Sequence, residues 1–275
     1  MKNNRAGGSG KPRTWILLRG LGREQGHWGP FSDIFASNFP DDEVLMIDLP
    51  GAGEFRDLTS PRDMNGIFQF VRAQAIERTK AQAQFCLVSI SLGAMVALEW
   101  LKQRPDDLSG CVLINSSSKA VSPIFHRLRW QVWRKFLSLI TITSPREREK
   151  AIIELVINSE AARERALPLW YRLAVERPIR YINFTNQLLA ASRFKTLPAH
   201  PDVPMLILCG LGDRFVDPSC SILMHEKMKW PVEKHPWGGH DLTWDDPQWV
   251  TQKIRSWSEA SAISLDGGAD TSNKL

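Results

Sequence analysis

Short apolar runs alternate with stretches of helical periodicity along most of this 275-residue sequence. Short buried strands that alternate with helices are typical of a parallel sheet covered by helices on both faces. The alternation therefore predicts an α/β fold, with a mostly parallel sheet of about six strands flanked by helices. The expected strands are residues 15–18, 44–47, 85–90, 111–114, 205–209 and 232–235.

One long segment, residues 119–198, interrupts the alternation between the fourth and fifth expected strands. Apolar residues recur there at helical spacing, so we expect several helices. Helices inserted at this point predict a cap over the carboxyl edge of the sheet, where open α/β sheets bind ligands. The two apolar stripes are Trp130, Trp133, Leu137 and Ile140, and then Phe184, Leu188 and Ala191.

The remaining segments complete the predicted domain organisation. Residues 14–118 and 199–259 form the expected α/β core. Residues 1–13 are rich in Gly, Lys and Asn and are expected to be flexible, and residues 260–275 are expected to be a disordered tail. The helices expected within the core are residues 64–80, 92–101 and 247–257.

The composition is that of an ordinary globular protein, with 43% hydrophobic and 24% charged residues. The run Trp15–Leu18 after the basic N-terminus is too short for a signal peptide, and no later stretch approaches a membrane span. The four cysteines contain no C-x-x-C pair, which argues against a zinc site or a disulfide framework. We therefore expect a soluble, cytoplasmic protein.

Patterns for metals and cofactors are missing from the sequence. The six histidines lie apart, and no H-E-x-x-H cluster is present. Neither a Rossmann nor a phosphate-loop glycine pattern occurs. We expect no metal and no cofactor.

The most specific signal for function is the segment Ser89-Ile-Ser91-Leu-Gly93, between an expected strand and an expected helix. A nucleophile elbow holds its serine in a strained turn, so that the hydroxyl projects from the sheet toward substrate. Gly93 supplies the small residue needed where strand and helix approach closely, whereas Ser89 replaces the usual glycine. The alternative is that Ser91 only caps the following helix.

Two later loops carry candidate partners for Ser91. Asp213 follows a strand in a glycine turn, where it is either the acid of a triad or a plain turn aspartate. Asp217 is the rival acid, although it is better placed to begin the next helix. His240 lies in a Gly-Gly-His loop after the last strand, from which it can swing over the serine. It could also be an ordinary surface histidine, and His235 is a weaker candidate because it lies within the strand.

Serine, acid and histidine, each placed after a strand, follow the triad order of the α/β-hydrolases. The loop 48–53, which reads Asp-Leu-Pro-Gly-Ala-Gly, is a further landmark of that superfamily. The chain resembles the superfamily over about residues 14–259, and within it the capped carboxylesterases close to the pimeloyl-acyl-carrier-protein methyl ester esterases. The resemblance implies a catalytic triad of Ser91, Asp213 and His240.

The resemblance also implies how such a site would work. His240 would remove the Ser91 proton, while Asp213 would hold the imidazole in the right tautomer. The family places one oxyanion donor on the residue after the nucleophile, here the backbone N–H of Leu92. The other comes from the loop after the first strand, here the backbone N–H of Leu21.

Arg19 departs from the family pattern, which usually has His-Gly where this chain has Arg19-Gly20. One interpretation is that its guanidinium donors support the oxyanion loop. The other is that Arg19 binds an acidic group of the substrate.

Positive charge is concentrated in the expected cap. Residues 119–198 contain 15 Lys or Arg and 6 Asp or Glu, whereas the rest of the chain holds 20 basic and 24 acidic residues. The aromatic residues of the expected cap are typical of a core, and its charged residues are typical of a solvated face. An excess of positive charge nevertheless also attracts acidic partners. An acidic acyl-carrier protein or a phosphorylated thioester would fit. Because no recognition motif accompanies the charge, we expect no nucleic-acid binding.

The sequence therefore predicts a serine hydrolase that cleaves a carboxylic ester, with a carrier-linked acyl methyl ester as one candidate substrate. The expected partner is a small-molecule ester or acyl substrate, either free or carried on an acidic acyl-carrier protein that docks on the basic cap. A thioesterase or lactonase with the same triad is the first alternative. The second is a hydrolase fold that binds a ligand without catalysis, because a fold alone does not prove activity.

Overall fold

The computed structural model describes residues 13–79, 84–129, 132, 135, 139, 141–197 and 202–266. Six strands pair in parallel in the order β2-β1-β3-β4-β5-β6. The predicted fold class is confirmed, and each expected strand is present with its ends shifted by at most three residues. The strands are β1 (Thr14–Leu18), β2 (Glu43–Met46), β3 (Phe85–Ile90), β4 (Leu108–Ile114), β5 (Met205–Gly210) and β6 (Val232–His235).

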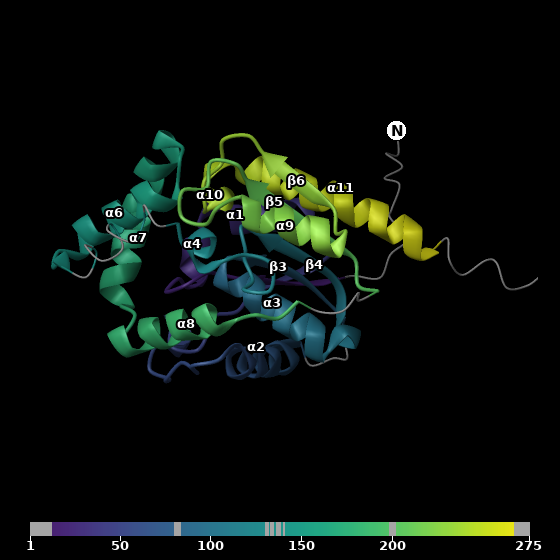
Figure 1. Cartoon of the computed structure of the whole chain (residues 1–275), viewed down its shortest axis with the longest axis horizontal. Helices are drawn as coiled ribbons and strands as arrows, with labels where there is room; N and C mark the ends of the chain where they lie inside the picture. The colour runs from purple at the N-terminus through teal and green to yellow at the C-terminus, as the bar shows by residue number, and fades with distance from the viewer. Residues whose placement is uncertain are drawn as a thin grey trace, which may run out of the picture.

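Helices cover both faces of the sheet because its central strands are apolar on both faces (Figure 1). Side chains alternate across a strand, so Trp15 and Leu17 of β1 face one way and Ile16 and Leu18 the other. The first pair packs with α1 (Pro30–Asn38) and α11 (Pro247–Asp266). The second pair packs with α2 (Met64–Thr79), α3 (Leu92–Gln103) and α9 (Ser219–Met228). All four β1 side chains are fully buried.

The segment between β4 and β5 carries further helices, as the sequence predicts. Figure 1 shows α6 and α7 extending to one side of the sheet. They pack together through their own apolar cluster, which includes Ile153 and Trp170. The predicted stripe around Phe184 lies on α8, whereas the stripe from Trp130 to Ile140 falls on residues outside the described part. The helices are α4 (Ile124–Arg127), α6 (Pro145–Val156), α7 (Glu160–Glu176) and α8 (Tyr181–Arg193).

The predicted tail is wrong over residues 260–266, because α11 continues to Asp266. Val250 and Ile254 anchor the helix in the core, and the alanines that follow favour its continuation. Residues 267–275 lie outside the described residues, as do residues 1–12 of the predicted flexible N-terminus. Arg13, the last residue of that segment, is held by Asp42, whose Oδ1 accepts from its backbone N at 2.9 Å.

The first turn of α3 lies directly against the end of β1. A Cβ added at Gly93 would come within 2.4 Å of the Leu18 carbonyl oxygen, so only glycine fits there. This close approach brings the loops after β1 and β3 together at the carboxyl edge of the sheet.

Short helices in the connecting loops are η1 (Gln25–Trp28), η2 (Gly53–Phe55), η3 (Pro105–Asp107) and α10 (Leu242–Asp245).

Within the part of the chain that the structure describes, we find no helix with the length and apolar character needed to cross a lipid bilayer.

Candidate active site

Ser91 occupies the tight turn between β3 and α3. Its φ of 55° and ψ of −112° lie in a region that non-glycine residues rarely adopt, and such strain is commonly found at functional sites. Its backbone N–H donates to the Ile114 carbonyl at 2.9 Å, which fixes the turn to the end of β4. The Ser91 side chain makes no capping hydrogen bond to α3, so the helix-cap alternative is wrong.

His240 and Asp213 meet at the same edge of the sheet. Nδ1 of His240 lies 2.7 Å from Oδ2 of Asp213, and both side chains are buried. The other oxygen of Asp213, Oδ1, accepts the backbone N–H groups of Phe215 at 2.8 Å and Val216 at 2.9 Å. These bonds orient the carboxylate toward the imidazole.

The two rival residues make other contacts. Oδ1 of Asp217 accepts the backbone N–H of Ser219 at 3.0 Å, as expected for an acid at the start of α9. That bond helps to lower the pKa of Asp217, although burial acts in the opposite direction. His235 accepts the Gly238 N–H at Nδ1, and its Nε2 lies 3.3 Å from Asp246. Neither is paired with the other in the manner of Asp213 and His240.

Ser91 lies where two small cavities meet, each of about 100 Å³. Ser91, Leu21 and Phe215 line both of them. The first cavity also contains His240, and its walls are largely apolar side chains of the cap. The second contains Leu92 and Arg127 and is not lined by His240.

The expected oxyanion donors lie beside Ser91. Leu92 is the first residue of α3, where backbone N–H groups lack partners within the helix. Leu21 belongs to the loop after β1, and the preceding Gly20 is so close that a Cβ there would lie 3.2 Å from Ser91 Cβ. The next residue, Gly22, donates its N–H to Gln187 Oε1 at 3.0 Å. The loop is therefore held against Ser91.

Arg19 is almost fully buried and faces Asp241, the residue after His240. Its Nη1 donates to Asp241 Oδ1 at 3.3 Å, and its Nη2 forms an ion pair with Oδ2 of the same carboxylate. The guanidinium also lies over the Trp28 ring, 4.8 Å from the centroid. Because the carboxylate already compensates this charge, the geometry favours loop support by Arg19 over binding of an acidic substrate group.

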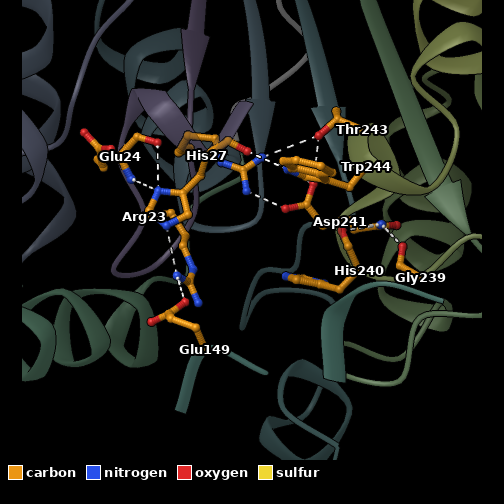
Figure 2. Close-up of polar contacts among 11 residues, drawn as sticks. Arg23, Glu24, His27, Glu149, Gly239, His240, Asp241, Thr243 and Trp244 are labelled. Carbon is orange, nitrogen blue, oxygen red and sulfur yellow. Dashed lines mark hydrogen bonds and ion pairs between the residues drawn. The ribbon is translucent and has the colours of Figure 1, made fainter. Parts of the chain in front are cut away.

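Figure 2 shows residues of the loops after β1 and β6, which the ion pair between Arg19 and Asp241 connects. Arg23, Glu24 and His27 of the loop after β1 lie on one side, and His240, Asp241 and Thr243 of the loop after β6 lie on the other. Thr243 Oγ1 donates to Asp241 Oδ1 at 2.7 Å, which orients the carboxylate.

Asn115 is a site residue that sequence reasoning missed. It follows β4 with a φ of 48°, and its Nδ2 donates to the carbonyls of Gly239 and His240, each at 2.9 Å. Its Oδ1 accepts the Gly210 N–H at 2.8 Å. One buried amide thus connects the loop that carries His240 to the end of β5. An asparagine at a strand end, where it tolerates a left-handed conformation, was the available signal.

Gln187 on α8 links the cap to the loop after β1. Besides accepting from Gly22, its side chain donates from Nε2 to the Pro50 carbonyl at 3.2 Å, and it is fully buried. We expect Gln187→Leu to lower the melting temperature measured by circular dichroism, because it leaves two backbone groups unpaired at roughly 1–3 kcal/mol each. Gln69→Leu, at an exposed position, is the matched control and should have little effect. Equal melting temperatures for both variants would contradict the assigned role.

Two acidic groups with raised pKa values lie near this loop, and one of them, Glu24, lines a cavity of about 340 Å³ under the cap. Burial raises the pKa of Glu24 to about 7, helped by the charge of Asp48 and opposed by Arg177. Burial likewise raises the pKa of Asp48 to about 6. Burial and the neighbouring arginines Arg23 and Arg19 lower the pKa of His27, so it stays neutral.

The raised pKa of Glu24 predicts a pH-dependent stability. The folded protein holds the Glu24 proton more tightly than the unfolded chain, whose value is near 4.5. The stabilisation of the folded state by this tighter proton binding is therefore fully present below about pH 4.5, and it is lost as the pH rises through about 7. Between pH 5 and pH 8 the free energy of unfolding, measured by urea denaturation, should fall in the wild-type protein. In Glu24→Gln this fall should be smaller by roughly 2–3 kcal/mol. Exposed Glu77→Gln is the control, and an unchanged slope in Glu24→Gln would refute the assignment.

Known proteins share this architecture. Residues 15–253 match the model of the alpha/beta hydrolase family. No curated protein matches the chain. A candidate non-heme bromoperoxidase from Mycobacterium tuberculosis H37Rv superposes with a TM-score of 0.71 at 17% identity, covering 92% of this chain and 94% of its own. An esterase from Rhodococcus sp. ECU1013 gives 0.71 at 16% identity, with 90% of each chain covered.

A thermophilic esterase from Thermogutta terrifontis gives a TM-score of 0.68 at 18% identity, covering 92% of this chain and 91% of its own. At such low identities these structures show a shared fold. The family match spans most of the sequence, from β1 into α11. The chain therefore belongs to the alpha/beta hydrolase family.

Proposed function

We infer that this protein is a serine hydrolase that cleaves a carboxylic ester through Ser91, His240 and Asp213. The observation that carries the proposal is the 2.7 Å contact between His240 Nδ1 and Asp213 Oδ2, at a cavity that His240 and Ser91 both line. Family membership and the fold shared with esterases support an enzyme of this kind.

The geometry supports a two-step acyl transfer. His240 takes the Ser91 proton through Nε2 as Oγ attacks the ester carbonyl, and Asp213 stabilises the imidazolium that forms. The backbone N–H groups of Leu21 and Leu92 then donate to the oxyanion, each contributing on the order of 3 kcal/mol in the transition state. His240 returns the proton to the leaving alkoxide, and water later hydrolyses the acyl-enzyme by the same route.

The leaving group is best placed on the His240 side of the serine, because the histidine must reach its oxygen. Cap residues such as Ile152, Leu155 and Trp170 make the cavity there largely apolar. An apolar alcohol therefore fits this side. A thioester or lactone uses the same triad, so the choice among these substrates depends on the cap pocket.

An acidic carrier remains part of the proposal, supported by the 15 basic and 6 acidic residues of 119–198. The rate constant kcat/KM for a carrier-linked ester should then fall steeply with salt, because charges are screened beyond about 10 Å at 0.1 M. Neutralising several cap arginines by substitution should also lower kcat/KM for the carrier-linked ester. If neither change alters kcat/KM, the carrier does not dock through this charge.

The test of the function is covalent labelling combined with a substrate panel. A fluorophosphonate should label the intact protein once, and peptide mass spectrometry should place the adduct on Ser91. The panel compares free methyl esters, carrier-linked methyl esters, acyl thioesters and lactones by kcat/KM. Ligand binding without turnover or labelling would instead favour the non-catalytic binding protein.

A further inference from the structure

Arg127, the last residue of α4, is a buried guanidinium in the cap. It is only 9% exposed, and burial lowers its pKa. Its Nη2 donates to the Ala191 carbonyl at 2.6 Å and its Nη1 to the Ser192 carbonyl at 3.3 Å. Its Nε donates to Ser117 Oγ at 3.5 Å. These three partners are neutral oxygens.

Three other arginines around the site contrast with Arg127. Arg19 is paired with Asp241, Arg23 with Glu149 and Arg177 with Glu24. Arg127 forms no ion pair with any carboxylate among the residues that the structure describes. A charge buried without a counter-ion is costly, and the cost is recovered when an anion arrives.

Arg127 is also placed where a substrate group can reach it. It lines the second cavity at Ser91, together with Leu92 and the apolar side chains of Met95 and Leu188. Ser91 lines both cavities, whereas His240 lines only the first of the two. The acyl group of an ester can extend into the second cavity when the alcohol occupies the cavity that contains His240. Arg127 has five N–H donors. Three of them donate to oxygens of the protein, so donors remain for a ligand.

We propose that Arg127 binds an anionic group on the acyl part of the substrate, so that the enzyme favours esters whose short acyl chain ends in a carboxylate or a phosphate. The proposal rests on the proposed ester hydrolysis and adds the substrate class. A guanidinium suits both anions because its planar array of donors matches their oxygens. The methylene chain between ester and anion would contact Met95 and Leu188.

The first experiment compares chain-matched methyl esters with the wild-type protein. Monomethyl succinate, glutarate and adipate are paired with methyl butanoate, pentanoate and hexanoate, and the corresponding ω-phosphonate esters separate the two anions. We expect kcat/KM to favour the anionic member by about tenfold or more at one chain length. Free dicarboxylate should also inhibit hydrolysis of the neutral ester competitively, while the matched monoacid should not. Equal kcat/KM values within every pair would overturn the proposal.

The second experiment assigns the preference to Arg127. Arg127→Met should lower kcat/KM for the anionic ester at least tenfold more than for the neutral ester, and Arg127→Lys should restore part of the preference. Arg193→Met, at an exposed position at the end of α8, is the control and should keep the wild-type ratio. An equal loss on both esters in Arg127→Met would mean a structural role only.

The two levels of the hypothesis fail in different ways. If ester hydrolysis itself is wrong, the wild-type protein turns over no ester of either kind, and fluorophosphonate does not label Ser91. If only the anion site is wrong, labelling and turnover persist without a charge preference. Should Arg127→Met not fold, the inhibition by free dicarboxylate still decides the question with the wild-type protein.

Discussion

Ser91→Ala is expected to lower kcat for ester hydrolysis by about a million-fold and to abolish fluorophosphonate labelling. Removing the nucleophile of a serine hydrolase has an effect of that order, because only binding and the oxyanion donors then remain to assist attack by water. The assay is hydrolysis of a short nitrophenyl ester, with labelling followed by mass spectrometry. Circular dichroism should show that the fold is kept, since alanine replaces a side chain that does not cap α3.

Ser89→Ala provides the matched control two residues away on β3. Ser89 is fully buried, and its Oγ has no hydrogen-bond partner in the described part of the structure. Alanine removes that unpaired hydroxyl, so the melting temperature should stay the same or rise. Turnover and labelling should remain close to wild type. Labelling that persists at full strength in Ser91→Ala would show that another residue is the nucleophile.

Asp213→Asn has the second largest expected effect, a fall in kcat of about ten-thousand-fold. The turn fixes one oxygen of residue 213, because the N–H groups of Phe215 and Val216 donate to Oδ1. Asparagine keeps those bonds by placing its oxygen there, so its NH₂ group faces His240 Nδ1. The imidazole must then carry its proton on Nε2, and this tautomer cannot accept the proton of Ser91.

The control for this variant is Asp217→Asn. Asp217 accepts from the Ser219 N–H at the start of α9 and does not contact His240. We expect kcat to change less than about threefold and stability to fall by up to about 1 kcal/mol, since the asparagine oxygen can still accept the Ser219 N–H. The comparison uses the pH profile of kcat/KM for both variants. A larger loss of activity in Asp217→Asn than in Asp213→Asn would reverse the assignment of the acid.

Local sequence patterns were sufficient to predict the elements of the core. The strand at 85–90 is apolar at every position except Ser89, and the helix after it is mostly apolar over residues 92–101, so each specifies its own geometry. The close packing at Gly93 then places Ser91 at the carboxyl edge, where the loops that carry Asp213 and His240 also end. The end of α11 was mispredicted because a polar, alanine-rich sequence is compatible with either a tail or a helix.

The environment of each polar group could not be predicted in the same way. Asn115 and Gln187 bind backbone groups more than 90 residues away in the sequence, so no local pattern reveals their partners. Arg19 and Arg127 look alike in the sequence, yet the fold pairs Arg19 with Asp241 and leaves Arg127 facing neutral oxygens.

The sequence by itself therefore determined the fold class and the order of serine, acid and histidine. Both follow from short-range periodicity and from the connection of each loop to its strand. Only the tertiary structure decided which carboxylate meets His240, which arginine is compensated and which faces the cavity at Ser91. The reason is physical: the strength of a charge depends on burial and on neighbours within a few ångströms, and in this protein those neighbours come from distant parts of the chain.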